Sequence, residues 1–144
     1  MITKSNLETM EYGKKVAKNA KANDLFFLVG DLAAGKTTFV KGFVSYFNTD
    51  LNVISPTFNI LKVYNINNKI SNIYHFDLYR LKGVEELYDI GFEEYIYDMN
   101  SITLIEWPDI LLPYMEKTYK LIKIKKINDD EREINEDIIY RDDK

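Results

Sequence analysis

The chain has 144 residues, the length of one typical domain with a single hydrophobic core. Apolar residues make up 46% of it and charged residues 29%, a balance that argues against disorder. It contains no cysteine and only one histidine, His75, which excludes disulfides, thiolate metal sites and a metal cage built from histidines. No apolar run approaches the roughly 20 residues of a membrane span, and the N-terminus lacks the apolar core of a signal peptide. We therefore expect a soluble, cytoplasmic protein.

The net charge of −4 is unevenly distributed. From Asp129 onward there are eight acidic and three basic residues, so the rest of the chain is nearly neutral. Such a surface does not bind nucleic acid unaided, and any contact with RNA is expected to run through a partner. We treat residues 1–144 as one domain, in which residues 129–144 form an acidic tail that is either frayed or an edge strand.

The first predicted elements are two helices that flank a strand. Ser5 and Glu8 form an S-x-x-E capping box, which predicts the start of a helix that ends before Asn23. The apolar run at residues 25–29 predicts a buried strand, and residues 37–47 predict an amphipathic helix. The expected buried face of the first helix is Leu7, Met10, Ala17 and Ala20, and that of the second is Phe39, Val40, Phe43, Val44 and Phe47.

The second half of the chain reads as strands with short helices between them. Residues 52–64 are β-rich with an irregularity at Pro56, residues 65–69 read as a hairpin turn, and residues 70–79 as the returning strand. Two short helices are expected at residues 84–90 and 93–98, separated by Gly91. A buried strand at residues 102–105, a short helix and a lysine-rich strand at residues 119–127 complete the body. The lysines of that last strand are expected on a solvated face.

Residues 30–37 read G-D-L-A-A-G-K-T and match G-x-x-x-x-G-K-[ST] at every fixed position. In such a loop the glycines let backbone N–H groups turn toward phosphate oxygens, and the following helix N-terminus favours an anion. Lys36 would reach the β- and γ-phosphates and the Thr37 hydroxyl would bind Mg²⁺. The alternative is a glycine turn with a solvated lysine. A buried strand before the loop and an amphipathic helix after it favour phosphate binding. The residues expected to bind ATP here are Asp31, Leu32, Ala33, Ala34, Gly35, Lys36, Thr37 and Thr38.

Two carboxylates are candidates for the magnesium site. Glu106 closes the strand at residues 102–105, and Asp77 closes the strand that contains residues 73–76. Each has the alternative of simply leaving the core for solvent, as isolated acids at strand ends commonly do. With a phosphate loop present, we expect at least one of them to bind the ion, directly or through water. The expected fold is a three-layer, P-loop NTPase-like α/β sandwich with a mostly parallel central sheet and antiparallel flanking strands.

With these motifs in place, residues 9–108 resemble the TsaE family, the ATPase subunit of bacterial tRNA threonylcarbamoyladenosine (t6A) biosynthesis. The resemblance rests on four blocks in order: residues 30–38, S-P-T-F at residues 55–58, H-F-D-L-Y-R-L at residues 75–81, and L-I-E-W-P at residues 104–108. Many families share the first block. The third and fourth blocks at these distances are much more specific to this family.

The resemblance implies slow, Mg²⁺-dependent hydrolysis of ATP in support of a threonylcarbamoyl-transferase complex of the TsaD and TsaB type. It implies catalytic roles for Lys36, Asp77 and Glu106, with Thr37 and Glu106 as Mg²⁺ ligands. Asp77 would position the attacking water or reach the ion through water, and Thr57 would sense the γ-phosphate. Ala33 departs from the family, which usually has glycine there. If that position needs a positive φ, alanine costs about 1 kcal/mol or more, and we expect altered affinity rather than loss.

Three other functions were weighed against this one. A small-molecule kinase commonly clamps the moving phosphoryl group with several arginines, whereas this chain has three, of which Arg132 and Arg141 lie in the acidic tail. A GTP switch should carry N-K-x-D, and the nearest string, N-K-I-S at residues 68–71, lacks the aspartate. A non-catalytic nucleotide sensor stays open. His75 is interpreted as a hydrogen-bonded structural residue, and the roles of Arg80 and Trp107 stay undecided.

Overall fold

The structure is a computed structural model that describes residues 1–54, 56 and 60–141. Thr57 therefore lies outside the described residues, as do the residues on either side of Pro56. In chain order the elements are β1 (Ile2–Thr3), α1 (Asn6–Asn19), β2 (Leu25–Val29), α2 (Lys36–Phe47), β3 (Leu61–Asn65), β4 (Asn72–Asp77), α3 (Glu85–Asp89), α4 (Phe92–Ile96), β5 (Ile102–Glu106), the 3-10 helices η1 (Pro108–Ile110) and η2 (Leu112–Tyr114), β6 (Tyr119–Lys126) and β7 (Arg132–Ile139).

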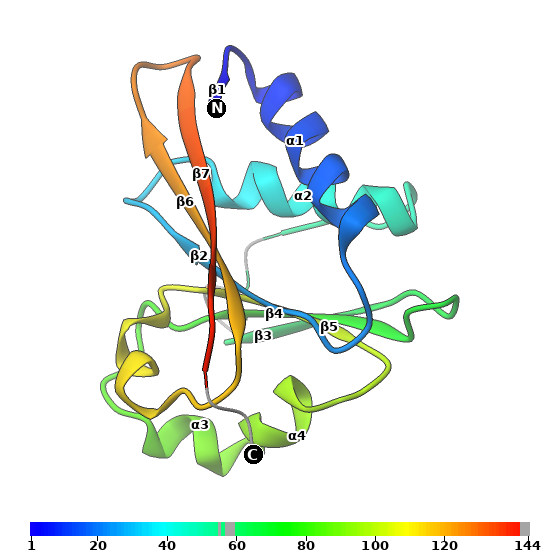
Figure 1. Cartoon of the computed structure of the whole chain (residues 1–144), viewed down its shortest axis with the longest axis vertical. Coiled ribbons are helices and arrows are strands. Elements are labelled where there is room, and N and C mark those ends of the chain that lie inside the picture. The colour runs from blue at the N-terminus through cyan, green and yellow to red at the C-terminus, as the bar shows by residue number, and fades with distance from the viewer. Residues whose placement is uncertain (55, 57–59, 142–144) are drawn as a thin grey trace.

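The strands form one sheet in the order β1-β7-β6-β2-β5-β4-β3. The four central strands are parallel, because β2 pairs in parallel with β5 and β6, and β4 pairs in parallel with β5. At the two sides, β3, β7 and β1 each pair antiparallel to a neighbour. Figure 1 shows α1 and α2 on one side of this sheet and α3 and α4 on the other. The predicted three-layer α/β sandwich is therefore confirmed.

Alternation along β2 builds a core on each face of the sheet. Phe26 and Leu28 belong to the cluster under α1 and α2, whereas Leu25 and Phe27 belong to the cluster under α3 and α4. All four side chains are at most 2% exposed. This burial on both faces explains why β2 is an uninterrupted apolar run, as expected of a central parallel strand. The phosphate loop starts where this strand ends.

Helix α1 begins as predicted but buries a different face. The Ser5 hydroxyl accepts a hydrogen bond from the Glu8 N–H (3.1 Å), and the Glu8 carboxylate accepts one from the Lys4 N–H (3.0 Å). The expectation that Leu7 is buried is wrong, because its side chain is 67% exposed. The face against α2 is centred on Gly13, whose α-carbon approaches the Phe39 carbonyl so closely that a Cβ would clash. Close approach of small residues, rather than apolarity alone, sets this contact. The buried residues of α1 are Thr9, Tyr12, Gly13, Val16 and Ala17.

Helix α2 packs as predicted, with Phe39, Val40, Phe43 and Val44 fully buried. Its Gly42 meets the Met10 carbonyl of α1 in a second close approach that leaves no room for a Cβ. Two glycines, one on each helix, thus bring the helices into backbone contact. The β-rich prediction for residues 52–64 was too long, since the strand in the described residues starts only at Leu61. The remaining helices and strands lie within a few residues of their predicted bounds.

The acidic tail contains a full strand of eight residues, β7, which lies between β6 and β1. It is not frayed, and only its first two residues, Arg132 and Glu133, have β1 as an outer strand, so most of β7 lies at the edge of the sheet, as one of the two alternatives predicted. Ile134 is 1% exposed and anchors the strand in the core, while Glu133, Glu136 and Asp137 of the same strand stay half-buried or exposed. On β6, Lys123, Lys125 and Lys126 are exposed as predicted, and Lys120 forms an ion pair with Asp24 at 2.9 Å.

Candidate nucleotide-binding site

The predicted phosphate loop joins the buried strand β2 to the amphipathic helix α2. Gly35 has φ 107° at the N-cap of α2, and its carbonyl accepts the first helical hydrogen bond from the Phe39 N–H (2.9 Å). Ala33 has φ 62°, so the position at which the family usually has glycine does adopt the left-handed conformation. The loop thus combines a helix N-terminus with two residues of positive φ, the geometry that turns N–H groups toward an anion.

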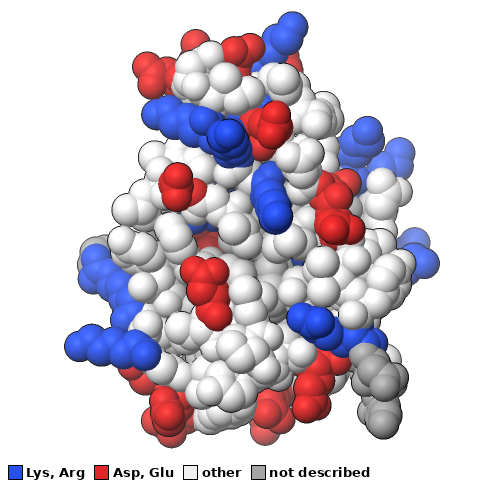
Figure 2. Space-filling model, turned by 60° about the vertical axis from the view of Figure 1, so that its left-hand side comes forward, with Lys and Arg blue, Asp and Glu red and all other residues white. Residues whose placement is uncertain are grey.

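The two predicted carboxylates end neighbouring parallel strands. Asp77 of β4 lies opposite Glu106 of β5 in the register of the sheet, and they are 6% and 3% exposed. Because carboxyl ends of parallel strands meet at one edge of the sheet, both acids lie beside the phosphate loop. Figure 2 shows the surface of the molecule on the side where, in Figure 1, these strands end. The alternative that these acids simply point into bulk solvent is therefore wrong, because both carboxylates are buried.

A cavity of about 250 Å³ joins the loop to these acids. It is lined by Asn6, Leu32, Ala33, Ala34, Gly35, Lys36, Thr37, Thr38, Asp77, Tyr79, Glu106, Trp107 and Arg132. Most of the predicted site residues therefore meet in one place. Asp31 does not line the cavity; its carbonyl accepts a hydrogen bond from the Ala34 N–H (3.0 Å) and shapes the turn. Arg80 is exposed and also lies outside the lining.

Lys36 is buried, with 5% of its surface exposed. Its ammonium group donates a hydrogen bond to the Gly30 carbonyl and lies 3.6 Å from the ring centroid of Trp107. Burial lowers the pKa of Lys36, and the negative charges of Glu106 and Asp77 oppose that shift. The cation is thus held by a carbonyl and an aromatic face, within the electrostatic influence of two carboxylates.

Trp107 closes one side of the cavity. Its backbone is left-handed, with φ 56°, which is uncommon for a residue other than glycine. This turn ends β5 and places the indole over Lys36, where the exposed ring of Tyr79 packs on it at 4.7 Å between centroids. The sequence left the direction of Trp107 undecided between the core and a partner. The structure packs it on the core cluster under α3 and α4 and also over Lys36 of the phosphate loop.

His75 is fully buried on β4, two residues before Asp77. Its Nε2 lies 2.6 Å from Glu106 Oε2, and its Nδ1 has no hydrogen-bond partner among the described residues. An Nε2–H that donates to Glu106 leaves only a lone pair unpaired at Nδ1, which costs less than an unpaired N–H. The interpretation of His75 as a hydrogen-bonded structural residue is confirmed. Its partner is a carboxylate of the site itself.

The oxygen atoms at this site suit a magnesium ion. Mg²⁺ prefers hard oxygen ligands, and at nucleotide sites it is held by one or two carboxylates together with substrate phosphates and water. Thr37 provides a hydroxyl, and Glu106 and Asp77 provide carboxylates. The described residues contain no cluster of three or more acidic or histidine side chains able to bind a metal alone. Such a donor set fits an ion that arrives with a nucleotide.

Arg132 is a site residue that sequence reasoning missed. Its Nε donates a hydrogen bond to the Ala34 carbonyl of the phosphate loop at 2.8 Å. The sequence placed it in a tail without an assignable role, and its neighbours are mostly acidic. Arg132 contacts the loop only because the β6–β7 hairpin folds β7 back along β6. Strand β6 in turn pairs with β2, which leads into the loop. No local pattern in the sequence carries that information.

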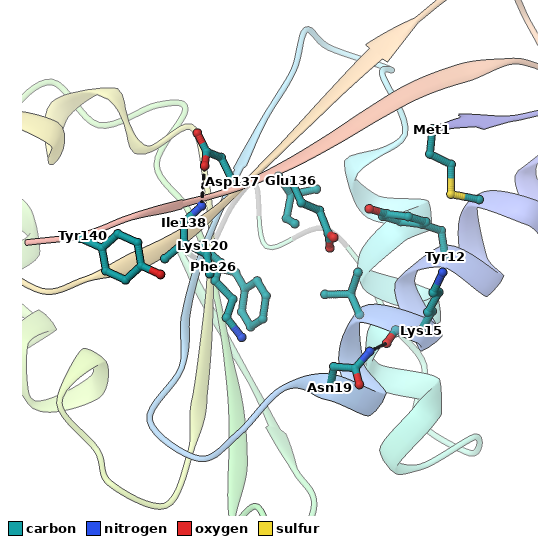
Figure 3. Close-up of a pocket in the computed structure, with 12 residues that line it drawn as sticks. Met1, Tyr12, Lys15, Asn19, Phe26, Lys120, Glu136, Asp137, Ile138 and Tyr140 are labelled. Carbon is teal, nitrogen blue, oxygen red and sulfur yellow. Dashed lines mark hydrogen bonds between the residues drawn. The ribbon is translucent and has the colours of Figure 1, made fainter.

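A larger cavity than the one beside the phosphate loop lies elsewhere in the structure. It measures about 680 Å³ and lies between α1 and the strands β6 and β7 (Figure 3). Figure 3 shows Tyr12 and Glu136 pointing toward each other across it, and burial together with the Glu136 charge raises the pKa of Tyr12. None of the residues predicted to bind nucleotide or metal lines this cavity. Size alone would therefore have located the site wrongly.

These observations define a three-layer α/β protein of the P-loop NTPase-like fold. None of the helices in the described residues has the length and apolar character of a membrane span. A family model described as "Threonylcarbamoyl adenosine biosynthesis protein TsaE" matches residues 3–134. The chain belongs to the TsaE family.

Relatives and a solved structure agree with this assignment. The chain is 40% identical over 137 residues to a tRNA threonylcarbamoyladenosine biosynthesis protein TsaE of Rickettsia typhi, covering 86% of this chain and 92% of the relative. It is also 40% identical over 127 residues to the protein of that name in Bacillus subtilis, covering 88% of this chain and 77% of the relative. The crystal structure of Bacillus subtilis YdiB superimposes with a TM-score of 0.75 at 35% identity, covering 93% of this chain and 80% of that one.

Proposed function

We propose that this protein is a cytoplasmic, Mg²⁺-dependent ATPase that supports t6A biosynthesis. Its relatives carry the name tRNA threonylcarbamoyladenosine biosynthesis protein TsaE. In this proposal ATP is hydrolysed to ADP and phosphate, and the threonylcarbamoyl transfer itself is performed by other subunits, of the TsaD and TsaB type. Contact with tRNA is indirect, because the body of the chain has no basic field.

The observation that carries the proposal is the convergence of Lys36, Thr37, Asp77 and Glu106 on one cavity. They come from α2, β4 and β5, which are far apart in the sequence. An ammonium group, a hydroxyl and two carboxylates beside a phosphate loop are the groups that hold a nucleoside triphosphate and its metal ion. A glycine turn that binds no phosphate would have no need of two buried carboxylates in the same cavity.

Each group has a role that follows from its position. Lys36 lies close enough to the loop to exchange the Gly30 carbonyl for phosphate oxygens. Mg²⁺, when bound with the nucleotide, neutralises charge that develops on the phosphate oxygens. Glu106 keeps one oxygen for the ion while the other accepts a hydrogen bond from His75. Asp77, whose carboxylate accepts a hydrogen bond from the Tyr79 N–H at 3.0 Å, would orient the attacking water.

The site has few groups of its own to stabilise the transition state. Arg132 is the one arginine among the described residues that line the cavity, and backbone carbonyls occupy its Nε and Nη1 donors. An arginine supplied in trans raises hydrolysis by about 10³–10⁵-fold in related phosphoryl-transfer systems. We therefore propose weak hydrolysis by the isolated chain. The partner would dock over the rim of the site, which is formed by the exposed Tyr79 and the half-buried Trp107.

Steady-state phosphate release tests this function directly. ATP turnover by the purified chain is measured alone, with TsaD- and TsaB-type subunits, and with those subunits and tRNA, using Lys36→Ala as the inactive reference. We expect slow turnover that the subunits accelerate. Fast turnover that the subunits leave unchanged would indicate a free-standing enzyme. Nucleotide binding without any turnover, even with all components present, would indicate a sensor.

A further inference from the structure

Arg132 is the first residue of β7, and its charge is buried beside the phosphate loop, with 8% of the residue exposed. Among the described residues no carboxylate forms an ion pair with it. Burying a cation without an anionic partner is costly unless its N–H groups find strong acceptors. Such an arrangement points to a specific task for this side chain.

The acceptors are backbone carbonyls from two segments. Nε donates to the Ala34 carbonyl of the phosphate loop at 2.8 Å. Nη1 donates to carbonyls of the β6–β7 turn, those of Asn128 at 2.7 Å and Glu131 at 3.0 Å. One rigid, planar guanidinium group therefore connects the loop to a turn almost a hundred residues away in the sequence.

The bond to Ala34 fixes the direction of a whole peptide group. The Ala34 carbonyl and the Gly35 N–H belong to one planar trans peptide, so they point in opposite directions. While Arg132 holds the carbonyl toward β7, the Gly35 N–H faces away from β7. We propose that Arg132 is a positioning residue that holds the phosphate loop in its anion-binding conformation, a role that rests on the proposed function.

The conformation of the loop explains why it needs such support. Ala33 and Gly35 both have positive φ, and the Cβ of alanine makes this conformation unfavourable at Ala33. Residues in sparsely populated backbone conformations persist where the surrounding structure over-determines them. Arg132 provides this restraint on the outer side of the loop. Its Nη2 lies 3.5 Å from the Ala33 carbonyl, and a Cβ added at Gly35 would lie only 3.4 Å from its Nε. A lysine in its place has its three N–H donors on one nitrogen and lacks the planar fork through which Nε and Nη1 donate to separate segments.

Binding of Mg²⁺-ADP and of inorganic tripolyphosphate, measured by calorimetry, tests this role. The variants are Arg132→Lys and Arg132→Gln, with Arg141→Gln as the matched control because it removes an equal charge from an exposed position just beyond the same strand. We expect both Arg132 variants to bind both ligands at least about tenfold more weakly, the loss typical of a charge-assisted hydrogen bond, and the control to bind normally. Normal binding by folded Arg132→Lys would overturn the role.

Two further measurements separate this role from overall stability and from the proposed function. In the unsubstituted protein, the Arg132 Nε–H should exchange slowly with solvent and shift in ¹⁵N NMR spectra when tripolyphosphate binds; fast exchange that binding leaves unchanged contradicts the role even if no variant folds. Lys36→Ala provides the second comparison. If Lys36→Ala binds Mg²⁺-ADP normally, the nucleotide site itself is misplaced. If Lys36→Ala fails to bind while Arg132→Lys binds normally, the role of Arg132 alone is wrong.

Discussion

His75 and Glu106 lie on neighbouring parallel strands, with His75 Nε2 2.6 Å from Glu106 Oε2. In the register of β4 and β5, His75 is opposite Leu104 and Asp77 is opposite Glu106, so this hydrogen bond runs diagonally across the strands. It engages one oxygen of the carboxylate and restricts rotation of its side chain. Outer hydrogen bonds of this kind orient metal ligands and tune their affinity.

Replacing His75 should therefore weaken the metal site without removing a ligand. His75→Ala is expected to require about 10–100-fold more Mg²⁺ for nucleotide binding, the usual effect of losing an outer hydrogen bond. Titrating Mg²⁺ at fixed ADP, monitored by a fluorescent nucleotide, gives this value. His75→Gln retains an N–H donor and should recover part of the affinity. An unchanged Mg²⁺ requirement in a folded His75→Ala protein would show that Glu106 is not a ligand.

Lys36→Ala and Thr37→Ala should each abolish function while the protein stays folded. Lys36 contacts the Trp107 ring and a loop carbonyl rather than the core, so its loss should cost only about 0.5–2 kcal/mol of stability. Calorimetry with Mg²⁺-ATP and thermal unfolding measure the two effects. Lys41→Ala, an exposed lysine on the same helix, is the control. ATP affinity and hydrolysis equal to those of the control would refute the phosphate-loop assignment.

Isosteric variants separate the two carboxylates. Glu106→Gln should weaken Mg²⁺-dependent nucleotide binding, because it removes a charged ligand. Asp77→Asn should still bind ATP but hydrolyse it about 10²–10⁴-fold more slowly, the range of a general-base contribution. Single-turnover hydrolysis and equilibrium binding distinguish these outcomes, with exposed Asp109→Asn as a nearby control. If Asp77→Asn loses binding and Glu106→Gln loses only rate, the two roles are exchanged.

Ala33→Gly should relieve backbone strain in the phosphate loop. Alanine at φ 62° costs about 1 kcal/mol or more relative to glycine, and the substitution should therefore raise the unfolding temperature by a few degrees. The control is Ala34→Gly, because Ala34 is buried in the same loop and is not among the residues of positive φ. That variant should be destabilised. Equal destabilisation of both proteins would mean that the left-handed turn at Ala33 is not present in solution.

Substitutions at the rim of the site should reduce ATP hydrolysis more when the partner subunits are present than when they are absent. Tyr79 is 48% exposed and packs on Trp107, so Tyr79→Ala should reduce the stimulation of hydrolysis by TsaD- and TsaB-type subunits more than the rate of the isolated chain. Tyr46→Ala removes a tyrosine of similar exposure from α2 and serves as the control. Equal stimulation of the Tyr79 and Tyr46 variants would place the partner elsewhere on the surface.

The parts of the site that follow from local rules could be predicted from the sequence. The loop motif identifies its residues directly, and Asp77 and Glu106 are predicted as site residues because each closes a buried strand. Their meeting follows from parallel pairing, which β2, β4 and β5 do adopt. The ends of the strands and helices were less accurate, since tertiary packing decides where they stop.

Features that depend on distant contacts could not be predicted in the same way. Leu7 was expected to be buried because it is apolar, whereas α1 packs through the small residue Gly13. Arg132 was grouped with an acidic tail because its contact with Ala34 spans 98 residues. The direction of Trp107 depends on a left-handed backbone turn that no composition rule indicates for tryptophan. Each of these is a property of the assembled sheet and helices.

If the proposed function holds, the paired glycines of α1 and α2 limit which parts of the protein can move when the bound nucleotide changes. Gly13 and Gly42 bring the two helices into backbone contact, so neither can slide or rotate against the other without a clash. The first turn of α2 carries Lys36 and Thr37, and this end of the site is therefore a fixed reference point. Loss of the γ-phosphate would then have to move the opposite side of the site, where Tyr79 and Trp107 follow the ends of β4 and β5. In this proposal α1 and α2 stay fixed, and the surface that changes is the rim that faces them.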